Sequence, residues 1–311
     1  MFWKNDWLTY GYDGDFNQKV KLTPTSKWDV KIKKTITRPV KTYHEELLLN
    51  ARAITERFPG PFDLMLSGGV DSELVLYCHK KLKLPINIFV AKYADGLNQL
   101  DFHEAMETCR IYDVKPTIID IDLKKFFESG EAYDYYTKSY CAAPGHLPHM
   151  KIIDCLDNMP IMADGMHIDS FRVNDKKSPW KIALPEKYFA QTVRCHYDNR
   201  PLIHKWTDYS PELTMSILNL NLHKWKKHKL MSPPIDFKSE TVANYLNELK
   251  YIINNLHVGT RIRPKLVGFE RDNSTSEKVP PFMLEFQEQY MSSNASWTTQ
   301  IWTTEEFKAL L

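Results

Sequence analysis

Glycine, paired cysteines and long apolar runs are all scarce in this chain of 311 residues. No run approaches the roughly 18 apolar residues that cross a bilayer, so no membrane-spanning segment is expected. The first residues, MFWKNDWLTY, lack the basic start and apolar stretch of a secretory signal, and the expected compartment is the cytoplasm. The five cysteines are odd in number and form no C-x-x-C pair, which disfavours a disulfide framework and a cysteine-rich zinc site.

An excess of charge is also lacking. The chain has 41 Lys and Arg against 39 Asp and Glu, a net charge of +2. Proteins that bind nucleic acid as their main task are usually more basic, so the net charge does not indicate tRNA as a partner, although a local basic patch is not excluded. A content of 43% hydrophobic and 26% charged residues is that of a globular protein and excludes disorder and low-complexity arrays.

Strand-type and helix-type segments alternate through the first half of the chain. Short apolar runs typical of buried strands lie at 62–67, 86–91, 116–122 and 160–165. Amphipathic patterns typical of helices lie at 44–58, 71–84, 101–113 and 147–159. This alternation predicts an α/β fold in which helices cover both faces of a parallel sheet.

Three regions differ in character. Residues 1–42 are rich in Trp, Tyr, Thr and Lys and are expected to form a small β appendage. Residues 43–170 carry the α/β alternation. Residues 171–311 are expected to be mainly helical or irregular, with one helix opening at Ser210-Pro211-Glu212 and another at 240–256, and to serve as a substrate or interaction region.

Two adjacent glycines mark the most informative place in this glycine-poor chain. Ser67-Gly68-Gly69-Val70-Asp71-Ser72 joins a predicted strand to a predicted helix. A tight turn there presents successive N–H groups beside the positive end of the helix dipole, and two serine hydroxyls add further donors. This arrangement favours a phosphate chain as the ligand. Asp71 is suited to hold a Mg²⁺ ion that also binds the phosphates.

The loop contains no lysine, which separates it from the G-x-x-x-x-G-K-[ST] loop, and it is not a G-x-G-x-x-G fingerprint. A loop of this kind suits release of pyrophosphate better than transfer of the γ-phosphate. SGGVDS after an apolar strand resembles the SGGxDS signature of the PP-loop ATP pyrophosphatases, and the order of helix, strand and loop most resembles the synthetase domain of asparagine synthetase. The resemblance covers about 44–170 and implies an adenine nucleotide alpha hydrolase-like fold that uses ATP and Mg²⁺.

The resemblance also implies roles for single residues. The phosphates are expected to lie on five residues of the loop: Ser67, Gly68, Gly69, Asp71 and Ser72. Leu66 is expected to contact the nucleoside, and the backbone of Val90-Ala91 the adenine. The segment ADGMHIDS, after the fourth predicted strand, resembles the S-G-E-G-A-D-E segment of the family. It places Gly165 near the nucleotide and makes Asp169, with Asp71, a catalytic acid that binds Mg²⁺.

Two positions depart from asparagine synthetase, because Met166 and Ser170 stand where that family has glutamates. This weighs against amide formation on aspartate and leaves ATP binding unaffected. A cation is still needed beside the departing pyrophosphate. Lys181, expected in the loop after the fourth strand, is the first candidate for this catalytic role. Three other basic residues of the same segment are alternatives: Arg172, Lys176 and Lys177.

Together these features predict a ligase-type enzyme that adenylates a carboxylate or carbonyl oxygen and releases pyrophosphate. An amine or ammonia then displaces AMP. The acceptor is a small molecule or a nucleobase. Two alternatives stay open: modification of tRNA or a nucleobase through the same adenylation, and a non-catalytic ATP-binding module. The segment before Ser67 is too short for a glutaminase domain, so ammonia is expected from solution or from a separate donor. Assembly into a homo-oligomer is left open.

Two further segments carry both a functional and a structural interpretation. His146 and His149, in CAAPGHLPHMK, either hold the acceptor or belong to a Pro/Gly loop that caps a helix. The basic run HKWKKHK at 223–229 either steers RNA or a phosphorylated substrate, or forms the exposed end of a helix. The brevity of the chain and its Lys-, Asn- and Met-rich character suggest a phage origin, in which case the compartment is the cytoplasm of a bacterial host.

Overall fold

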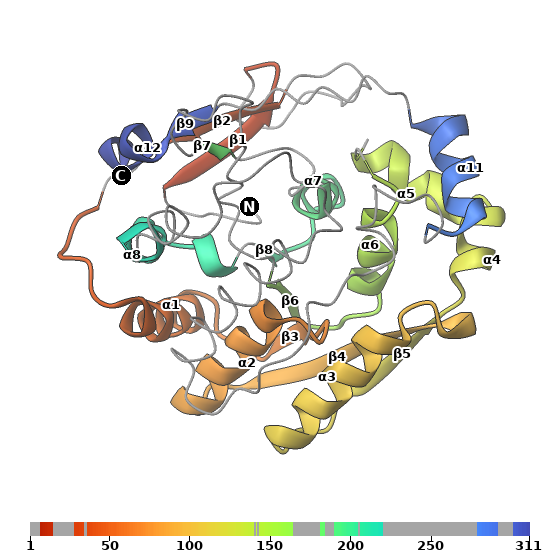
Figure 1. Ribbon diagram of the computed structural model, residues 1–311, viewed down its shortest axis with the longest axis horizontal. Helices are drawn as coiled ribbons and strands as arrows, with labels where there is room; N and C mark the ends of the chain where they lie inside the picture. The colour runs from red at the N-terminus through yellow and green to blue at the C-terminus, as the bar shows by residue number, and fades with distance from the viewer. Residues whose placement is uncertain are drawn as a thin grey trace, which may run out of the picture.

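The computed structural model of the protein describes residues 7–14, 28–33, 36–139, 141, 143–163, 181–183, 190–204, 206–219, 279–291 and 301–311 (Figure 1). The predicted helix at 240–256 and the basic run at 223–229 lie outside the described residues.

Five parallel strands form the central sheet, in the order β5-β4-β3-β6-β8. Their bounds are Phe62–Met65 for β3, Ile86–Tyr93 for β4, Thr117–Ile121 for β5, Met159–Met162 for β6 and Ile203–His204 for β8. The first four correspond to the predicted strands. The fifth, β8, was not predicted, because two residues are too few to show a period. The sequence had suggested that the second strand ends at Val90-Ala91. In the structure β4 continues to Tyr93.

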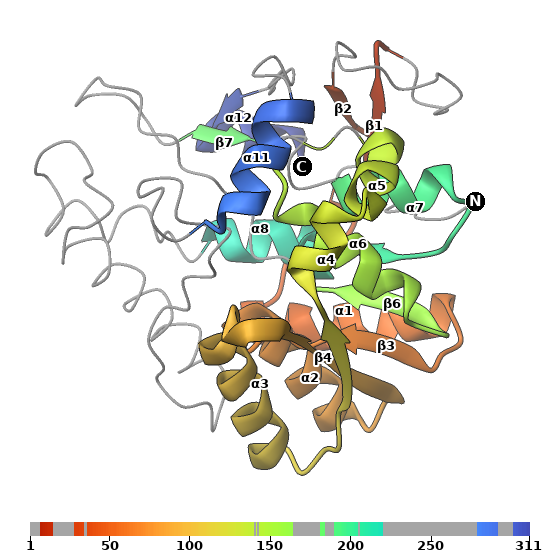
Figure 2. The same cartoon turned by 90° about the vertical axis from the view of Figure 1, so that its right-hand side faces the viewer.

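Helices cover both faces of this sheet, which confirms the predicted fold class (Figure 2). One face, here called the α2 face, packs against α1 (Tyr43–Arg57), α2 (Val70–Leu82), α3 (Gln99–Ile111) and α8 (Pro211–Asn219). The other, the α6 face, packs against α4 (Leu123–Glu128), α5 (Glu131–Ser139), α6 (His146–Asp154), α7 (Ala190–Tyr197) and α11 (Pro281–Tyr290). The short helices α4 and α5 were not predicted.

The side chains of β4 show how the strands separate the two layers. Ile88 and Val90 belong to the core under the α2 face, whereas Phe89, Ala91 and Tyr93 pack into the core under the α6 face. This alternation is the two-residue period of a strand. Because both faces are covered by apolar helix surfaces, the strand can be apolar at nearly every position.

Two small antiparallel sheets lie outside the central one. β1 (Leu8–Tyr12) pairs with β2 (Trp28–Ile32), which agrees with the predicted β appendage. β7 (Lys181–Ala183) pairs with β9 (Ile301–Thr303), which precedes α12 (Thr304–Leu310). Two short 3-10 helices, η1 (Ala94–Gly96) and η3 (Trp206–Asp208), complete the described elements. Lys181 was expected in a loop from the sequence. In the structure it is the first residue of the strand β7.

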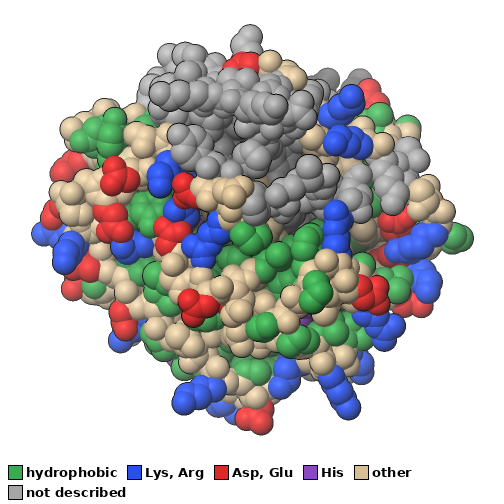
Figure 3. Space-filling view, turned by 180° about the vertical axis from the view of Figure 1, so that it is seen from behind, with side chains coloured by type: hydrophobic (Ala, Val, Ile, Leu, Met, Phe, Trp, Pro, Cys, Tyr) green, Lys and Arg blue, Asp and Glu red, His purple; other side chains and the backbone are tan. Residues whose placement is uncertain are grey.

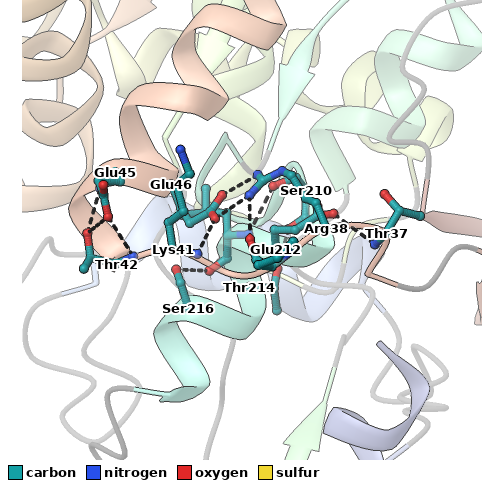
Figure 4. Close-up of polar contacts among 12 residues, drawn as sticks. Thr37, Arg38, Lys41, Thr42, Glu45, Glu46, Ser210, Glu212, Thr214 and Ser216 are labelled. Atoms are coloured by element: carbon teal, nitrogen blue, oxygen red, sulfur yellow. Dashed lines mark hydrogen bonds and ion pairs between the residues drawn. The ribbon is translucent and has the colours of Figure 1, made fainter.

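One buried carboxylate ties the segment before α1 to the helical layer. Glu46 is fully buried and accepts from Arg38 Nη1 at 2.6 Å, from Arg38 Nη2 at 2.5 Å and from the Lys41 N–H at 2.8 Å (Figure 4). Thr37 N donates to Oε1 of Glu212, on α8, at 3.3 Å. The chain leading into α1 is thus held to α1 and α8 together.

None of the described helices is long and apolar enough to cross a membrane. On the face shown in Figure 3, side chains of both charge signs are interspersed around hydrophobic ones. The described part of this face therefore carries no broad patch of a single sign.

Candidate phosphate-binding site

The glycine pair lies where the strand order of the sheet reverses. After β3 the chain passes through α2 to β4 on one side, whereas β6 lies on the other side of β3. Open parallel sheets bind their ligands outside the carboxyl ends of the strands at such a reversal. The loop that follows β3 thus occupies the position at which this fold class binds ligands.

Gly68 is required by the backbone. Its φ is +77°, a left-handed conformation that glycine adopts far more easily than other residues. A Cβ built on it would lie 2.5 Å from the carbonyl oxygen of Asp101 and 2.9 Å from the backbone N of Ala105. Both atoms belong to the first turns of α3, so Gly68 lets the loop pack directly on that helix.

Gly69 has a different reason to lack a side chain. It is the N-cap of α2 with φ −74° and ψ 161°, an extended conformation open to any residue. Among the described residues, a Cβ here would meet a single neighbour within 4 Å, the Ser67 hydroxyl at 3.3 Å. The backbone does not need glycine at this position. With respect to the described residues, glycine leaves open space beside Ser67 and the first turn of α2, which a side chain would fill.

Two serines shape the loop in different ways. Ser72 is buried, accepts from Ser67 N at 3.2 Å and donates to the carbonyl of Gly69 at 3.1 Å, so it fixes the turn. Ser67 is exposed; its hydroxyl lies 3.2 Å from the Ser72 hydroxyl and accepts from Gly69 N at 3.4 Å. A contact of 3.4 Å is long for an N–H to oxygen bond. Of the two serines, Ser67 is therefore the one whose hydroxyl is exposed and weakly held.

Asp71 is the second residue of α2 and is half-buried. Within the described residues, no three side chains of His, Cys, Asp or Glu lie close enough together to hold a metal ion. If a Mg²⁺ ion binds at the loop as the sequence predicts, Asp71 would be one ligand and phosphate oxygens of a substrate the others. This suits Mg²⁺, which usually binds through one or two carboxylates together with the phosphates of a substrate.

Leu66 and Val90 turn their side chains into the core under the α2 face, where they are 2% and 1% exposed. Leu66 N donates to the carbonyl of Phe89 at 2.8 Å, which continues the pairing of β3 with β4. Any contact of Leu66 or Val90 with a nucleotide would have to come from the main chain, so their predicted roles stay predictions.

Asn98 closes the carboxyl end of β4. Its Nδ2 donates to the carbonyl of Ala91 at 2.9 Å, and its Oδ1 accepts from Tyr93 N at 2.8 Å. The predicted adenine contact of Ala91 would share a carbonyl that already accepts this bond. Asn98 is best explained as a side chain that holds the turn into α3.

Lys92 is an exposed cation near the start of α3 that sequence reasoning missed. In the alternation of β4 it follows Ile88 and Val90 onto the α2 face, and its Nζ lies 5.9 Å from the ring centroid of Phe102. Phe102 adjoins Asp101, whose carbonyl lies against Gly68. The available signal was the position of Lys92 two residues after Val90, once the strand is extended to Tyr93.

The remaining predicted site residues are not tested. Gly165, Asp169 and the departures Met166 and Ser170 lie outside the described residues, as do Arg172, Lys176 and Lys177. The backbone of Lys181 lies in β7, but its side chain is outside the description. The second acid and the loop cation thus stay predictions, whereas Ser67, Gly68, Gly69, Asp71 and Ser72 do come together in one turn.

No protein-family model and no curated protein matches the sequence. Solved structures do. The NMN synthetase from Francisella tularensis is 14% identical at a TM-score of 0.33, over 72% of this chain and 98% of that one. The NH3-dependent NAD synthetase from Campylobacter jejuni is 14% identical at a TM-score of 0.32, over 81% and 93%. The glutamine-dependent NAD+ synthetase from Acinetobacter baumannii, in complex with ADP, is 19% identical at a TM-score of 0.30, over 49% and 34%.

These three structures are synthetases of NAD or NMN, and none of the three is an asparagine synthetase. The particular closeness to asparagine synthetase that the sequence suggested is therefore not shown. Scores this low carry no conclusion about the reaction.

Proposed function

We propose that the protein binds MgATP on the loop from Ser67 to Ser72 and uses it to adenylate an acceptor, with release of pyrophosphate. The observation that carries this proposal is the open space at Gly69. It lies at the N-terminus of α2, at the carboxyl edge of the sheet and at the reversal of strand order. The backbone conformation itself would accept a side chain there, so a ligand that needs this space is the reason we infer for glycine at this position.

A phosphate chain fits this space. The first N–H groups of α2 and its dipole attract anions, and the Ser67 hydroxyl adds a donor. Mg²⁺ held by Asp71 would neutralise part of the phosphate charge. Lys92 supplies a second positive charge beside the loop, in the role for which Lys181 was the candidate from sequence. The absence of lysine within the loop itself distinguishes the site from that of a γ-phosphate transferase.

The reaction follows from attack at the α-phosphorus, as the resemblance to PP-loop ATP pyrophosphatases implies. A carboxylate or carbonyl oxygen of the acceptor forms a bond to the α-phosphorus. The bond from this phosphorus to the oxygen bridging to the β-phosphorus breaks, and pyrophosphate leaves. An amine or ammonia then attacks the activated carbon and loses a proton, and the carbon–oxygen bond to AMP breaks. The residues of the loop align the phosphates and stabilise the leaving charge.

Product analysis tests the proposal. The purified chain is incubated with α-labelled ATP, Mg²⁺, ammonium and a panel of acceptors, namely amino acids, deazapurines and tRNA. We expect AMP and pyrophosphate in equal amounts. ADP as the main product would contradict adenylation while leaving the ATP site in place. Tight ATP binding with no turnover on any acceptor would favour a non-catalytic nucleotide-binding module.

Lys92→Met tests the proposed cation. We expect slower pyrophosphate release with an unchanged melting temperature, because Lys92 is exposed. Lys124→Met is a matched control, since the Lys124 side chain is 63% exposed on α4, a helix of the opposite face. Equal rates in the two variants would exclude Lys92 from the site.

A further inference from the structure

Four exposed lysines gather where two neighbouring helices end. Helix α2 leads into β4, and α3 leads into β5. β4 and β5 are parallel neighbours and both helices cover the α2 face, so the helices end next to each other at the amino edge of the sheet (Figure 2). This edge is opposite the one that carries the phosphate-binding loop. The two connections, 80–87 and 110–117, contain these exposed lysines: Lys80, Lys81, Lys83 and Lys115.

Packing and strand register hold the two connections side by side. Leu84 follows α2 and Val114 follows α3, and both side chains pack against the core under the α2 face. Phe89 of β4 pairs with Thr117 of β5, so Lys115, two residues earlier, lies near the level at which β4 begins. Neighbouring strands are about 5 Å apart. The lysines of both connections therefore reach the same region of solvent.

The charge of this surface is almost entirely positive. Besides the four lysines, the two connections carry one arginine, Arg110, and one acid, Asp113. Arg110 is neutralised by Glu107, which accepts from its Nε at 2.8 Å and from its Nη2 at 2.7 Å. None of the four lysines forms an ion pair with any residue that the structure describes. Four ammonium groups thus face a single carboxylate, and the surface attracts anions.

Helix capping does not explain Lys83. This residue ends α2 with φ 55° and ψ 37°, the left-handed conformation in which helices most often place glycine. Its N–H bonds to the carbonyls of His79 and Lys80, and glycine would make the same bonds without strain from a Cβ. The helix dipole favours a cation here, but Lys80 and Lys81 in the last turn already supply two. The side chain of Lys83 therefore exceeds what the helix end needs.

We propose that these four lysines, here called the lysine edge, bind the phosphates of single-stranded RNA. Contacts of lysine with phosphate supply essentially all of the affinity with which proteins bind nucleic acid regardless of sequence. A single strand fits better than a duplex, because its backbone can bend to place successive phosphates on two short connections. Single strands in a cell are mainly RNA. A local patch of this kind is compatible with a net charge of only +2.

Binding at the lysine edge does not depend on the proposed function. The phosphate-binding loop follows the carboxyl end of β3, whereas the lysine edge precedes the amino ends of β4 and β5. RNA bound at one edge leaves the other edge free for MgATP. The two activities can therefore be measured, and can fail, separately.

Fluorescence anisotropy with a labelled oligouridine of about ten nucleotides tests the proposal. For a single strand, the logarithm of the binding constant falls with the logarithm of salt concentration by about 0.7 per phosphate contacted. Three or four contacts give a slope of about −2 to −3, so binding should weaken about 20–50-fold between about 50 and 200 mM salt. No binding of the oligouridine at low salt, or a slope near zero, would overturn the proposal.

Variants locate the binding. Lys83→Gly should weaken oligouridine binding about fivefold at about 0.1 M salt, while the melting temperature stays within about 2 °C of wild type because glycine suits the left-handed conformation. The double variant Lys81→Gln/Lys115→Gln should lose about 25-fold. Lys124→Gln/Lys125→Gln is the matched control, since it removes the same charge from α4 on the opposite face. Equal losses in the two double variants, or no loss in the first, would exclude the lysine edge.

Two competitors identify the ligand and the place. Excess MgATP should leave the oligouridine bound, and its displacement by MgATP would place the RNA on the phosphate-binding loop and contradict the proposal. Vesicles of phosphatidylserine should not retain the protein at about 0.15 M salt. Retention that Lys81→Gln/Lys115→Gln abolishes would assign the lysine edge to a membrane surface instead of RNA. Failure of MgATP to bind would refute the proposed function and leave the oligouridine result unchanged.

Discussion

Changing each of the two adjacent glycines to alanine should affect a different property: Gly68→Ala should lower stability, and Gly69→Ala should lower MgATP affinity. Gly68→Ala forces a residue with a side chain into φ +77° and places its Cβ against two backbone atoms of α3. The left-handed conformation costs about 1–2 kcal/mol. Overpacking against backbone adds about 1–3 kcal/mol. We therefore expect a loss of about 2–5 kcal/mol in the free energy of unfolding.

Gly69→Ala should leave stability nearly unchanged. Its backbone is already extended, so alanine gains about 0.4–1 kcal/mol by restricting the unfolded chain. Alanine is a poorer N-cap than glycine, and this opposes the gain by a similar amount. The added methyl group occupies the space beside Ser67. We expect MgATP affinity to fall by more than about tenfold in a protein that folds normally.

Urea and thermal denaturation measure the first effect, and calorimetric titration with MgATP the second. For a chain of this size, about 2–4 °C of melting temperature is lost per kcal/mol, so Gly68→Ala should melt about 4–20 °C below wild type. A Gly68→Ala protein within about 1 kcal/mol of wild type would refute the close packing on Asp101 and Ala105. A Gly69→Ala protein that binds MgATP as wild type does would refute the phosphate cradle.

Three further predictions concern charged side chains. Asp71→Asn should weaken ATP binding at least about tenfold in the presence of Mg²⁺ and little in its absence. Asp95→Asn is the control, because Asp95 is exposed and has a φ of 58°, which Asn tolerates. Equal losses of affinity in the two variants would exclude Asp71 as a metal ligand. Arg38→Met should lower the free energy of unfolding by about 1–3 kcal/mol, because among the described residues only the Lys41 N–H would still donate to the buried carboxylate of Glu46. The Arg38 side chain is 38% exposed, so water compensates for part of the lost interaction. Unchanged unfolding in urea would show that the ion pair does not contribute to stability. Acid should destabilise the protein below about pH 4. Burial acts to raise the pKa of Glu46 and of Asp154, but arginine, together with the Lys41 N–H for Glu46 and the Tyr135 hydroxyl for Asp154, outweighs it and holds the two pKa values below the ordinary 4.5 and 3.8. The native state therefore binds fewer protons than the unfolded state, and this stability is lost as the pH falls through the lowered values. On acidification, the free energy of unfolding should fall less in Arg38→Met than in wild type. Parallel curves of unfolding free energy against pH for the two proteins would contradict this.

Short-range patterns were enough to predict the main elements of the fold. Four strands, the helices between them and the turn at Gly68 and Gly69 are visible in the sequence, because periodicity and glycine report on the local backbone. The N-terminal hairpin was also expected from its turn residues and β-forming side chains. The same methods missed β8, α4 and α5, since two to nine residues carry too little periodicity to be recognised.

The candidate site was predictable only as far as its loop. The sequence could not tell which glycine serves the backbone, because the clash at Gly68 comes from Asp101 and Ala105, more than thirty residues later in the chain. Nor could it show that Gln191 reaches His146 and His149 across more than forty residues. Lys92 became a candidate only once β4 was seen to extend past Ala91.

By itself, the sequence determined which segments become strands and helices and that a turn with two glycines leads from the first strand of the parallel sheet into a helix, since these depend on neighbours within one turn or one strand. Only the tertiary structure decided the strand order β5-β4-β3-β6-β8. That order depends on how apolar faces from distant segments bury one another, and no local pattern encodes it. It is this order that places the loop after β3 beside β6 and brings the α6 and α7 termini to the same edge.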